Sequence, residues 1–356
     1  MKDAVREHER LSVCVNKTLA QIKLEIENNS YPVTEADLLI LSDCPLCGSD
    51  KTLRISEVSL NKSLVFFSTD ICQDCLHIYR AISPNEAWFV ARWDQISTGT
   101  LSVYNESLEE KRRVRYELYY GLLHKHKRSG RLLDVGAAYG AGTRVFRERG
   151  FQVEALEPER DRAEYIRKIC DIETHSCTLD KFKPNDETYD LIVFAHCLEH
   201  LNDPVGSLKT LKNWLKKDGV IYLEIPIAWK VIDWQDSLFM AHKHNFVEKN
   251  IRKLVAELGF NVLDSYLIPD NDAPFCNLAL VIQPKSDGLA TIGSDRLLDP
   301  EQYDSQDLKC LYEIGLPVAR PAGEVLKFDV PHITNFYHIL KSDRRNCIVR
   351  DGFITY

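Results

Sequence analysis

Residues 131–142 join one acidic residue to a glycine-rich turn, a combination that can hold a nucleotide. Asp134 is the only acid in an apolar stretch that we predict to be a strand, and Gly136, Gly140 and Gly142 follow it closely. Glycine lets a backbone turn tightly and approach a ligand. The spacing G-x-x-x-G-x-G lacks the early second glycine with which dinucleotide sites approach a pyrophosphate. We therefore expect a nucleotide-like ligand without a pyrophosphate.

A second acidic residue stands at the expected tip of the next strand. That strand is predicted over residues 151–156, and Glu157 follows it, 21 residues after Gly136. A carboxylate in this place can accept hydrogen bonds from both hydroxyls of a ribose. The two acids and the glycine turn together predict a βα unit that binds a nucleoside.

Two later segments complete an ordered set of motifs, namely the apolar run at 189–194 and the sequence Cys-Leu-Glu-His-Leu at 197–201. With them, residues 105–285 resemble the class I S-adenosylmethionine-dependent methyltransferases. The resemblance implies an α/β fold with a Rossmann-like seven-stranded sheet, and S-adenosylmethionine (SAM) as the cofactor. It also implies these cofactor-binding residues: Asp134, Gly136, Tyr139, Gly140, Glu157, Thr178, Leu179, Ala195 and His196. A Rossmann-like fold that binds another nucleoside is the alternative.

Four of the 11 cysteines form two C-x-x-C pairs that 24 residues separate: Cys44, Cys47, Cys72 and Cys75. Residues 52–59 and 64–71 predict a hairpin between the pairs, which would bring four thiolates to about 2.3 Å from one Zn²⁺. Because four protein ligands leave no open position, we expect a structural zinc ribbon. Reduced or redox-active thiols are the alternative. His77 is predicted to be a surface residue and not a ligand.

Composition narrows the class of protein. The chain has 356 residues, of which 44% are hydrophobic and 28% are charged, as in ordinary globular proteins. It contains no run of about 18 apolar residues and no apolar core of a signal peptide near residue 1, so we expect a cytoplasmic protein without a membrane partner. The net charge of −8 argues against nucleic acid as a partner, since phosphate binding needs clustered Lys and Arg.

One basic cluster does occur, formed by Lys111, Arg112, Arg113, Arg115, Lys125, Lys127, Arg128 and Arg131. We interpret it as a solvated helix face. The alternative is a site for an anionic substrate such as a nucleotide diphosphate. Two tyrosines of the same region, Tyr104 and Tyr116, could close over the cofactor.

The patterns divide the chain into five parts. They are an N-terminal helical segment (1–43), a zinc ribbon (44–80), a helical connector (81–130), the SAM-binding methyltransferase domain (131–286) and a C-terminal extension (287–356). Apolar residues recur every three or four positions in the first part, which predicts one helical stripe. That stripe must be covered by the body of the protein or by a second copy in a homodimer.

Paired histidines lie where acceptor chemistry is expected. His242 and His244 fall in a predicted loop between a strand at 220–225 and a helix whose start Asn245 and Glu248 would mark as an N-cap box. Ligands of open α/β sheets bind at this carboxyl edge. Histidine can remove a proton from a hydroxyl or carbon acid near neutral pH. The preferred candidate base is His244, followed by His242 and His200, and His196 is a further candidate. A purely structural role is the alternative for the first three.

The order of the predicted domains along the chain gives an indication of which molecule receives the methyl group. A Cys-x-x-Cys ribbon ahead of a SAM domain with paired histidines resembles bacterial methyltransferases of deoxysugar and polysaccharide pathways. The resemblance implies transfer to a hydroxyl or carbon of a sugar, as a nucleotide sugar or glycan precursor. The zinc-containing sugar C-methyltransferases carry a Glu-His pair with a nearby Tyr in this loop, whereas residues 242–246 read His-Lys-His-Asn-Phe. This departure makes O-methylation at least as well supported as carbon methylation.

Two further hypotheses stay open. A zinc-ribbon rRNA base methyltransferase would share the order of parts, but the acidic charge counts against it. A non-catalytic zinc-ribbon interaction protein would keep only a decayed cofactor fold. The intact Asp134, Gly136, Gly140 and Glu157 count against that hypothesis.

Overall fold

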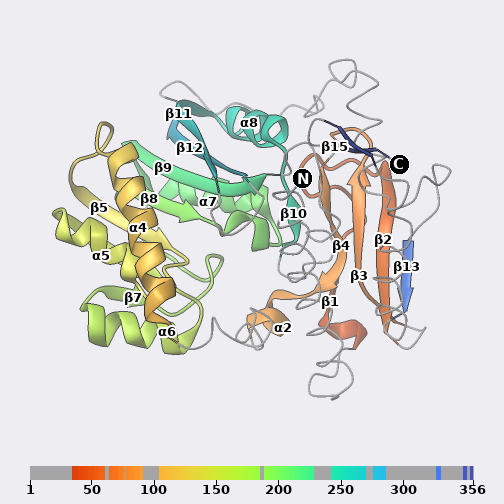
Figure 1. Ribbon diagram of the computed structural model, residues 1–356, viewed down its shortest axis with the longest axis horizontal. Helices are drawn as coiled ribbons and strands as arrows, with labels where there is room; N and C mark the ends of the chain where they lie inside the picture. The colour runs from red at the N-terminus through yellow and green to blue at the C-terminus, as the bar shows by residue number, and fades with distance from the viewer. Residues whose placement is uncertain are drawn as a thin grey trace.

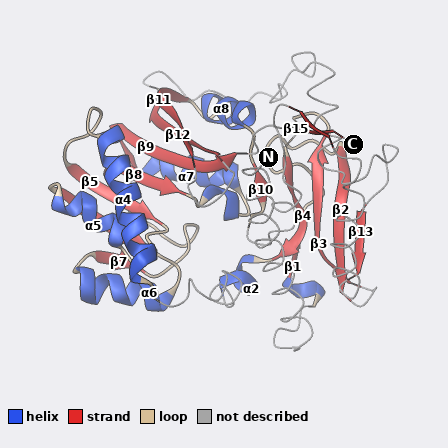
Figure 2. Ribbon diagram, viewed as in Figure 1, coloured by secondary structure: helices blue, strands red, loops and turns tan. Residues whose placement is uncertain are grey.

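The structure is a computed structural model that describes most of the central part of the chain. The described residues are 34–60, 64–75, 77–90, 104–184, 188–227, 242–269, 276–285, 326–329, 348–350 and 353–355. Two sheets dominate, a large one with helices on both faces and a smaller one formed mainly by the N-terminal strands (Figures 1 and 2). The expected helical stripe within residues 1–30 lies outside the described residues.

The larger sheet has seven strands in the order β11-β12-β9-β8-β5-β6-β7, as the methyltransferase resemblance implies. Its bounds are β5 Gly130–Val135, β6 Phe151–Leu156, β7 Glu173–His175, β8 Tyr189–Ala195, β9 Leu215–Ile227, β11 Phe260–Pro269 and β12 Cys276–Pro284. Strands β7, β6, β5, β8 and β9 are parallel, and β12 pairs antiparallel with both β9 and β11. The carboxyl ends of the parallel strands therefore meet at one edge, where a ligand can bind.

Helices cover both faces of this sheet because its strands are apolar on both sides. They are α4 Glu106–Leu123, α5 Ala141–Glu148, α6 Arg160–Tyr165, η2 Ile166–Cys170, η3 Leu198–His200, α7 Pro204–Trp214 and α8 Glu248–Glu257. Alternate residues serve the two faces: Leu132 packs in a core with Tyr119 of α4, and Leu133 packs in a core with Leu208 of α7. Figure 1 shows α4 and α7 on opposite sides of the sheet.

The ends of two helices test local predictions. Asp203 caps α7 as predicted, because its carboxylate accepts a hydrogen bond from Gly206 N at 2.7 Å and Pro204 occupies the first turn. The predicted N-cap at Asn245 is wrong, since Val247 precedes α8 and Asn245 belongs to a short strand, β10 (His244–Asn245). Pairing with a distant strand here replaces the local capping pattern.

The smaller sheet contains the predicted hairpin. Its bounds are β1 Leu38–Ile40, β2 Thr52–Leu60, β3 Leu64–Cys72, β4 Ile78–Pro84 and β13 Leu326–Asp329, in the order β1-β4-β3-β2-β13. Strand β10, from the methyltransferase part of the chain, pairs antiparallel with β4, so that His244 lies opposite Tyr79. The two sheets are thus joined through β10, which lies between them in Figure 1.

The remaining described elements are short. They are η1 Glu35–Asp37, α2 Glu86–Val90, β14 Ile348–Arg350 and β15 Phe353–Thr355. The predicted connector at 81–130 contains α2 and α4, but its first residues belong to β4, and α4 packs against α5 of the larger unit. Within the described residues, no helix has the length and apolar character that crossing a membrane requires.

Candidate active site

A cavity of about 460 Å³ opens at the carboxyl ends of β5, β6 and β8. This volume is in the range of small-molecule sites, roughly 300–1,000 Å³. Six of the nine expected cofactor residues border it: Gly136, Glu157, Thr178, Leu179, Ala195 and His196. The structure therefore brings together residues from the ends of four strands, β5, β6, β7 and β8, that lie far apart in the sequence.

The glycine turn after β5 has a backbone that only small residues fit. Gly136 has a φ of +79°, and a Cβ there would stand 2.5 Å from the Sγ of Cys197. The N–H of Gly136 donates to the carbonyl of Leu156 at 2.8 Å, which ties the turn to the end of β6. The turn thus keeps its backbone next to the cavity.

Glu157 follows β6 directly and is buried at the cavity wall. One of its oxygens accepts the N–H of Ala138 at 2.8 Å and the other accepts the N–H of Glu159 at 3.1 Å. Burial raises the pKa of this carboxyl to about 7, against the opposing charge of Arg162. Each carboxylate oxygen retains capacity for a further hydrogen bond, so the two oxygens fit a ribose diol.

Thr178 and Leu179 border the cavity from the segment after β7. The hydroxyl oxygen of Thr178 is buried and has no hydrogen-bond partner among the described residues. Buried polar groups are usually paired, so this hydroxyl fits a polar edge of a bound ligand. The hydroxyl of Thr178, the carboxylate of Glu157 and the glycine turn together fit a nucleoside cofactor.

Three expected cofactor residues do not border the cavity: Asp134, Tyr139 and Gly140. Asp134 is fully buried and accepts hydrogen bonds from the hydroxyls of Thr143 at 2.5 Å and Tyr116 at 2.9 Å. Its carboxylate thus joins α5 and α4 beneath the glycine turn. Tyr116 itself lines the cavity, whereas Tyr104 packs on Tyr139 and Tyr165.

His196 stands at the tip of β8 between two buried carboxylates. Its Nε2 lies 3.1 Å from Glu224 and its Nδ1 lies 3.6 Å from Glu199. Burial alone would lower the pKa of this imidazole, but Glu199 and Glu224 outweigh it and raise the pKa to about 9. These two carboxylates therefore favour the protonated form of His196 on the cavity wall.

The three candidate bases separate in space. His200 borders the cavity, and its ring centroid lies 5.0 Å from that of His242. His244 does not border the cavity, and its side chain is buried in β10 instead of in the expected loop. Its Nε2 bonds the carbonyl of Leu201 at 2.8 Å, and its Nδ1 lies 3.0 Å from Nε2 of His77. The pKa of His244 is lowered to about 3, and burial of the imidazole is the main cause.

The prediction that His77 is a surface residue is wrong. His77 is fully buried and stacks on Tyr79 and His244. The reason is long-range pairing: β4 and β10 bring together two histidines that are 167 positions apart. No local pattern near His77 signals this contact.

Other charged residues of the cavity are partly paired. Arg112 and Arg115, from the predicted basic cluster, border it and contact Glu109 and Glu224. Lys243 also borders it, is buried, and has a pKa lowered to about 8 by that burial. Sequence reasoning missed Lys243 as a site residue, although its place between two histidines was a possible signal.

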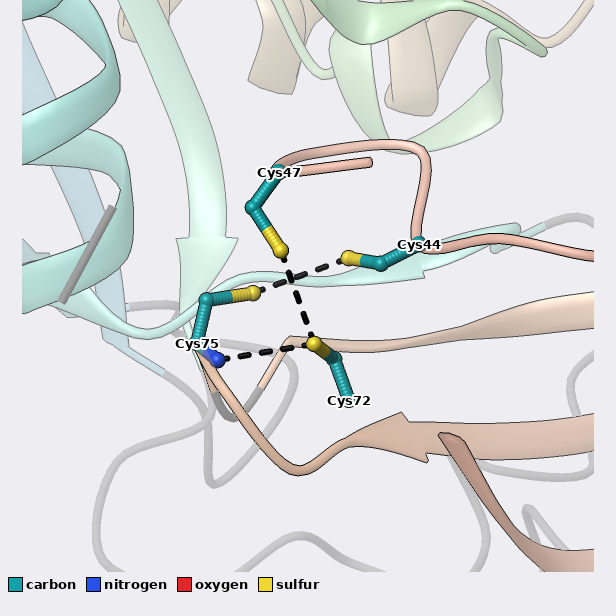
Figure 3. A group of neighbouring side chains, drawn as sticks. All are labelled: Cys44, Cys47, Cys72 and Cys75. Atoms are coloured by element: carbon teal, nitrogen blue, oxygen red, sulfur yellow. Dashed lines mark hydrogen bonds between the residues drawn. The ribbon is translucent and has the colours of Figure 1, made fainter. Parts of the chain in front are cut away.

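Four cysteine side chains converge beside the smaller sheet (Figure 3). The Sγ atoms of Cys44 and Cys75 are 3.6 Å apart, and those of Cys47 and Cys72 are 3.5 Å apart. All four sulfurs lie within 4.8 Å of one another. Tetrahedral zinc with bonds of about 2.3 Å needs sulfurs about 3.8 Å apart, so the cluster fits Zn²⁺.

Comparison with known proteins relates the part of the chain with the seven-stranded sheet to a family. Residues 108–265 match a family model described as a methyltransferase domain. The chain is similar to a solved structure of 1,6-didemethyltoxoflavin-N1-methyltransferase from Burkholderia thailandensis, which has 1,6-didemethyltoxoflavin and S-adenosylhomocysteine bound. The sequence identity is 18%, the match covers 60% of this chain and 98% of that one, and the TM-score is 0.45. A SAM-dependent methyltransferase from Leishmania major is similar at 18% identity, covering 53% and 76%, with a TM-score of 0.41. No curated protein matches the chain.

The matched region holds the glycine turn, Glu157 and most of the seven-stranded sheet. These observations define a class I methyltransferase domain of the α/β type. The chain therefore contains a methyltransferase domain at residues 108–265.

Proposed function

We propose that this protein transfers the methyl group of SAM to a hydroxyl of a sugar or similar small molecule, presented as a nucleotide conjugate or glycan precursor. The observation that carries this proposal is that one cavity is bordered by the nucleoside-type residues Glu157 and Thr178 and also by His200. A cofactor and a small acceptor can therefore share a single site. Transfer to a carbon of the sugar is the second form of the same proposal.

The residues that would hold the cofactor are Gly136, Glu157, Thr178, Leu179 and Ala195. When bound, SAM supplies an electrophilic methyl group on a sulfonium sulfur. Glu157 would orient the ribose, and the glycine turn would let the chain approach the methionine end. Holding the donor and acceptor in line is the main contribution that such a site makes to the rate.

A hydroxyl acceptor must also lose its proton. In our proposal His200, with the neighbouring ring of His242, takes this role in place of His244, because His200 borders the cavity and His244 does not. His196 is unsuited as a base, since its two carboxylate neighbours favour its protonated form. Arg112 and Lys243 supply positive charge to the same wall, which supports an acceptor that carries a phosphate.

The direct test is labelled SAM incubated with a panel of nucleotide sugars and, separately, with rRNA. We expect label on a sugar conjugate, and His200→Ala should lower turnover by about 10²–10⁴-fold while SAM affinity stays near that of the wild type. The exposed His124→Ala is the control and should keep its turnover. Label on rRNA but not on any sugar would show that the acceptor class is wrong.

We also propose one structural Zn²⁺ at Cys44, Cys47, Cys72 and Cys75. The spacing of the four sulfurs and the absence of any fifth described ligand in the cluster support a closed site. The zinc would hold the turn before β2 against the end of β3, which anchors the smaller sheet. Elemental analysis tests this site directly.

A further inference from the structure

Three side chains of two chain segments converge beside the cavity: Glu199, His200 and His242. One potential ligand atom of each lies within 4.8 Å of those of the other two. Glu199 and His200 belong to η3, and His242 lies two residues before β10. His200 borders the cavity, so anything held by the three side chains would lie at its wall.

The carboxylate of Glu199 is a second observation that points to a cation site. Its side chain is fully buried, and neither oxygen has a hydrogen-bond partner among the described residues. The nearest cationic groups are the rings of His196 at 3.6 Å and His200 at 3.8 Å from Oε1, beyond hydrogen-bond length. These ionic contacts partly offset the cost of burying the carboxylate, and a coordinated cation would add the direct bond that neither oxygen makes to the described residues.

The backbone holds the three side chains in a fixed arrangement. The N–H of Lys243 donates to the carbonyl of Glu199 at 2.7 Å, and the carbonyl of Lys243 accepts the N–H of Arg80 at 2.8 Å. The ring of His244 bonds the carbonyl of Leu201 at 2.8 Å. His242 is thus placed by bonds to η3 and to β4, and the donor set is preorganised as a metal site requires.

We propose that Glu199, His200 and His242 bind a divalent cation of the Mn²⁺, Fe²⁺ or Zn²⁺ class that orients the methyl acceptor. Two imidazoles and one carboxylate suit these borderline metals. Three protein ligands leave open positions, as in catalytic sites, and these can take oxygen atoms of a hydroxylated acceptor. This inference deepens the proposed function and rests on it for the identity of the acceptor.

The cation changes how the acceptor hydroxyl is activated. Coordination would lower the pKa of the bound hydroxyl, whose proton then leaves to water. With the cation bound, His200 and His242 would act as its ligands, and the cation would replace the base role proposed above for these two residues. The acceptor oxygen forms its bond to the methyl carbon as the carbon–sulfur bond breaks. The sulfur keeps that electron pair, so charge and atoms balance without an oxidant or reductant.

The test is Mn²⁺ binding by the whole protein without acceptor, followed by electron paramagnetic resonance of the free ion. Mn²⁺ prefers oxygen and nitrogen ligands, so the cysteine cluster does not compete for it. We expect one saturable site per chain, with affinity reduced at least about tenfold in Glu199→Gln and in His242→Ala, since even outer partners of metal ligands contribute 10–100-fold. The exposed His124→Ala should bind as the wild type does.

Circular dichroism and SAM affinity show which variants are folded, and His242→Ala provides the test if the buried Glu199→Gln does not fold. A wild-type protein without a saturable site, or a folded His242→Ala that binds Mn²⁺ as tightly as the wild type, would overturn the inference. Failure of the proposed function looks different. In that case Mn²⁺ still binds, but no sugar conjugate is methylated.

Discussion

Single side chains of the cavity combine burial with unused hydrogen-bonding capacity. Glu157 and Thr178 are two clear cases, because the carboxylate of Glu157 and the hydroxyl oxygen of Thr178 are buried at the cavity wall and each has room for a further partner. This unused capacity adds nothing to the stability of the free protein and is satisfied only on binding. Variants at these positions should therefore separate binding from folding.

The raised pKa of Glu157 predicts pH-dependent cofactor binding. Because the ionised carboxylate is the better acceptor for a ribose diol, SAM affinity should rise as pH increases from 6 to 8, through a pKa of about 7. Glu157→Gln should weaken binding by about 1.5–3 kcal/mol at pH 8 and remove the pH dependence. Titration calorimetry at several pH values measures both effects. A wild-type affinity that is flat over this range would contradict the prediction.

Removing the hydroxyl of Thr178 should weaken SAM binding without lowering the stability of the free protein. Thr178→Val keeps the shape but removes a buried oxygen that has no partner among the described residues. The free protein should be unchanged or up to about 1 kcal/mol more stable, while SAM affinity falls by about 0.5–1.5 kcal/mol. Denaturant unfolding and calorimetry measure the two quantities. Equal affinity of both proteins would show that this hydroxyl does not contact the cofactor.

Among the elements, the turn between β5 and α5 depends most on residue type. Gly136 has both a positive φ and no room for a Cβ, whereas Gly150 has a φ of +91° with open space around it. The two positions therefore separate backbone conformation from steric exclusion. This contrast gives a matched pair of variants.

Gly136→Ala should lose about 1–3 kcal/mol more stability than Gly150→Ala. Both variants place alanine at a positive φ, but only the first drives a Cβ into the Sγ of Cys197. Adding Cys197→Ala to Gly136→Ala should restore much of the difference, because it removes the clashing sulfur. Chemical denaturation provides the free energies. Equal losses in the two single variants would mean that the turn relaxes without cost.

At the scale of the whole molecule, the two sheets are coupled through β10. Its pairing with β4 and the contact between His77 and His244 connect the cysteine cluster's sheet to the wall of the cavity. A change in the smaller sheet should therefore reach residues 242–246 without passing through Glu157.

Loss of the zinc that we propose should lower turnover while SAM still binds. Cys72→Ser removes one of four ligands and should loosen the smaller sheet, so β10 and His242 lose their support. We expect less than one zinc per chain, faster hydrogen exchange over residues 242–246, and SAM affinity within a few-fold of the wild type. Cys177→Ser, outside the cluster, should keep its zinc. Full turnover in a zinc-free Cys72→Ser protein would show that the sheets are independent.

The sequence by itself determined the parts that depend on near neighbours. The glycine turn, the strand at 151–156 with Glu157 at its end, the cap at Asp203 and the hairpin between the cysteine pairs could all be predicted, because periodicity and turn chemistry act over a few residues. The motif order then indicated the seven-stranded methyltransferase sheet.

Only the tertiary structure decided which histidines reach the cavity. His244 and Asn245 form a strand instead of a loop and a cap because β4, more than 160 positions earlier, offers free backbone groups for pairing. The same pairing buries His77 and, through Lys243, places His242 beside Glu199. Local patterns carry no information about such partners, since the free energy of a long-range strand pair depends on both segments and on the core that holds them together.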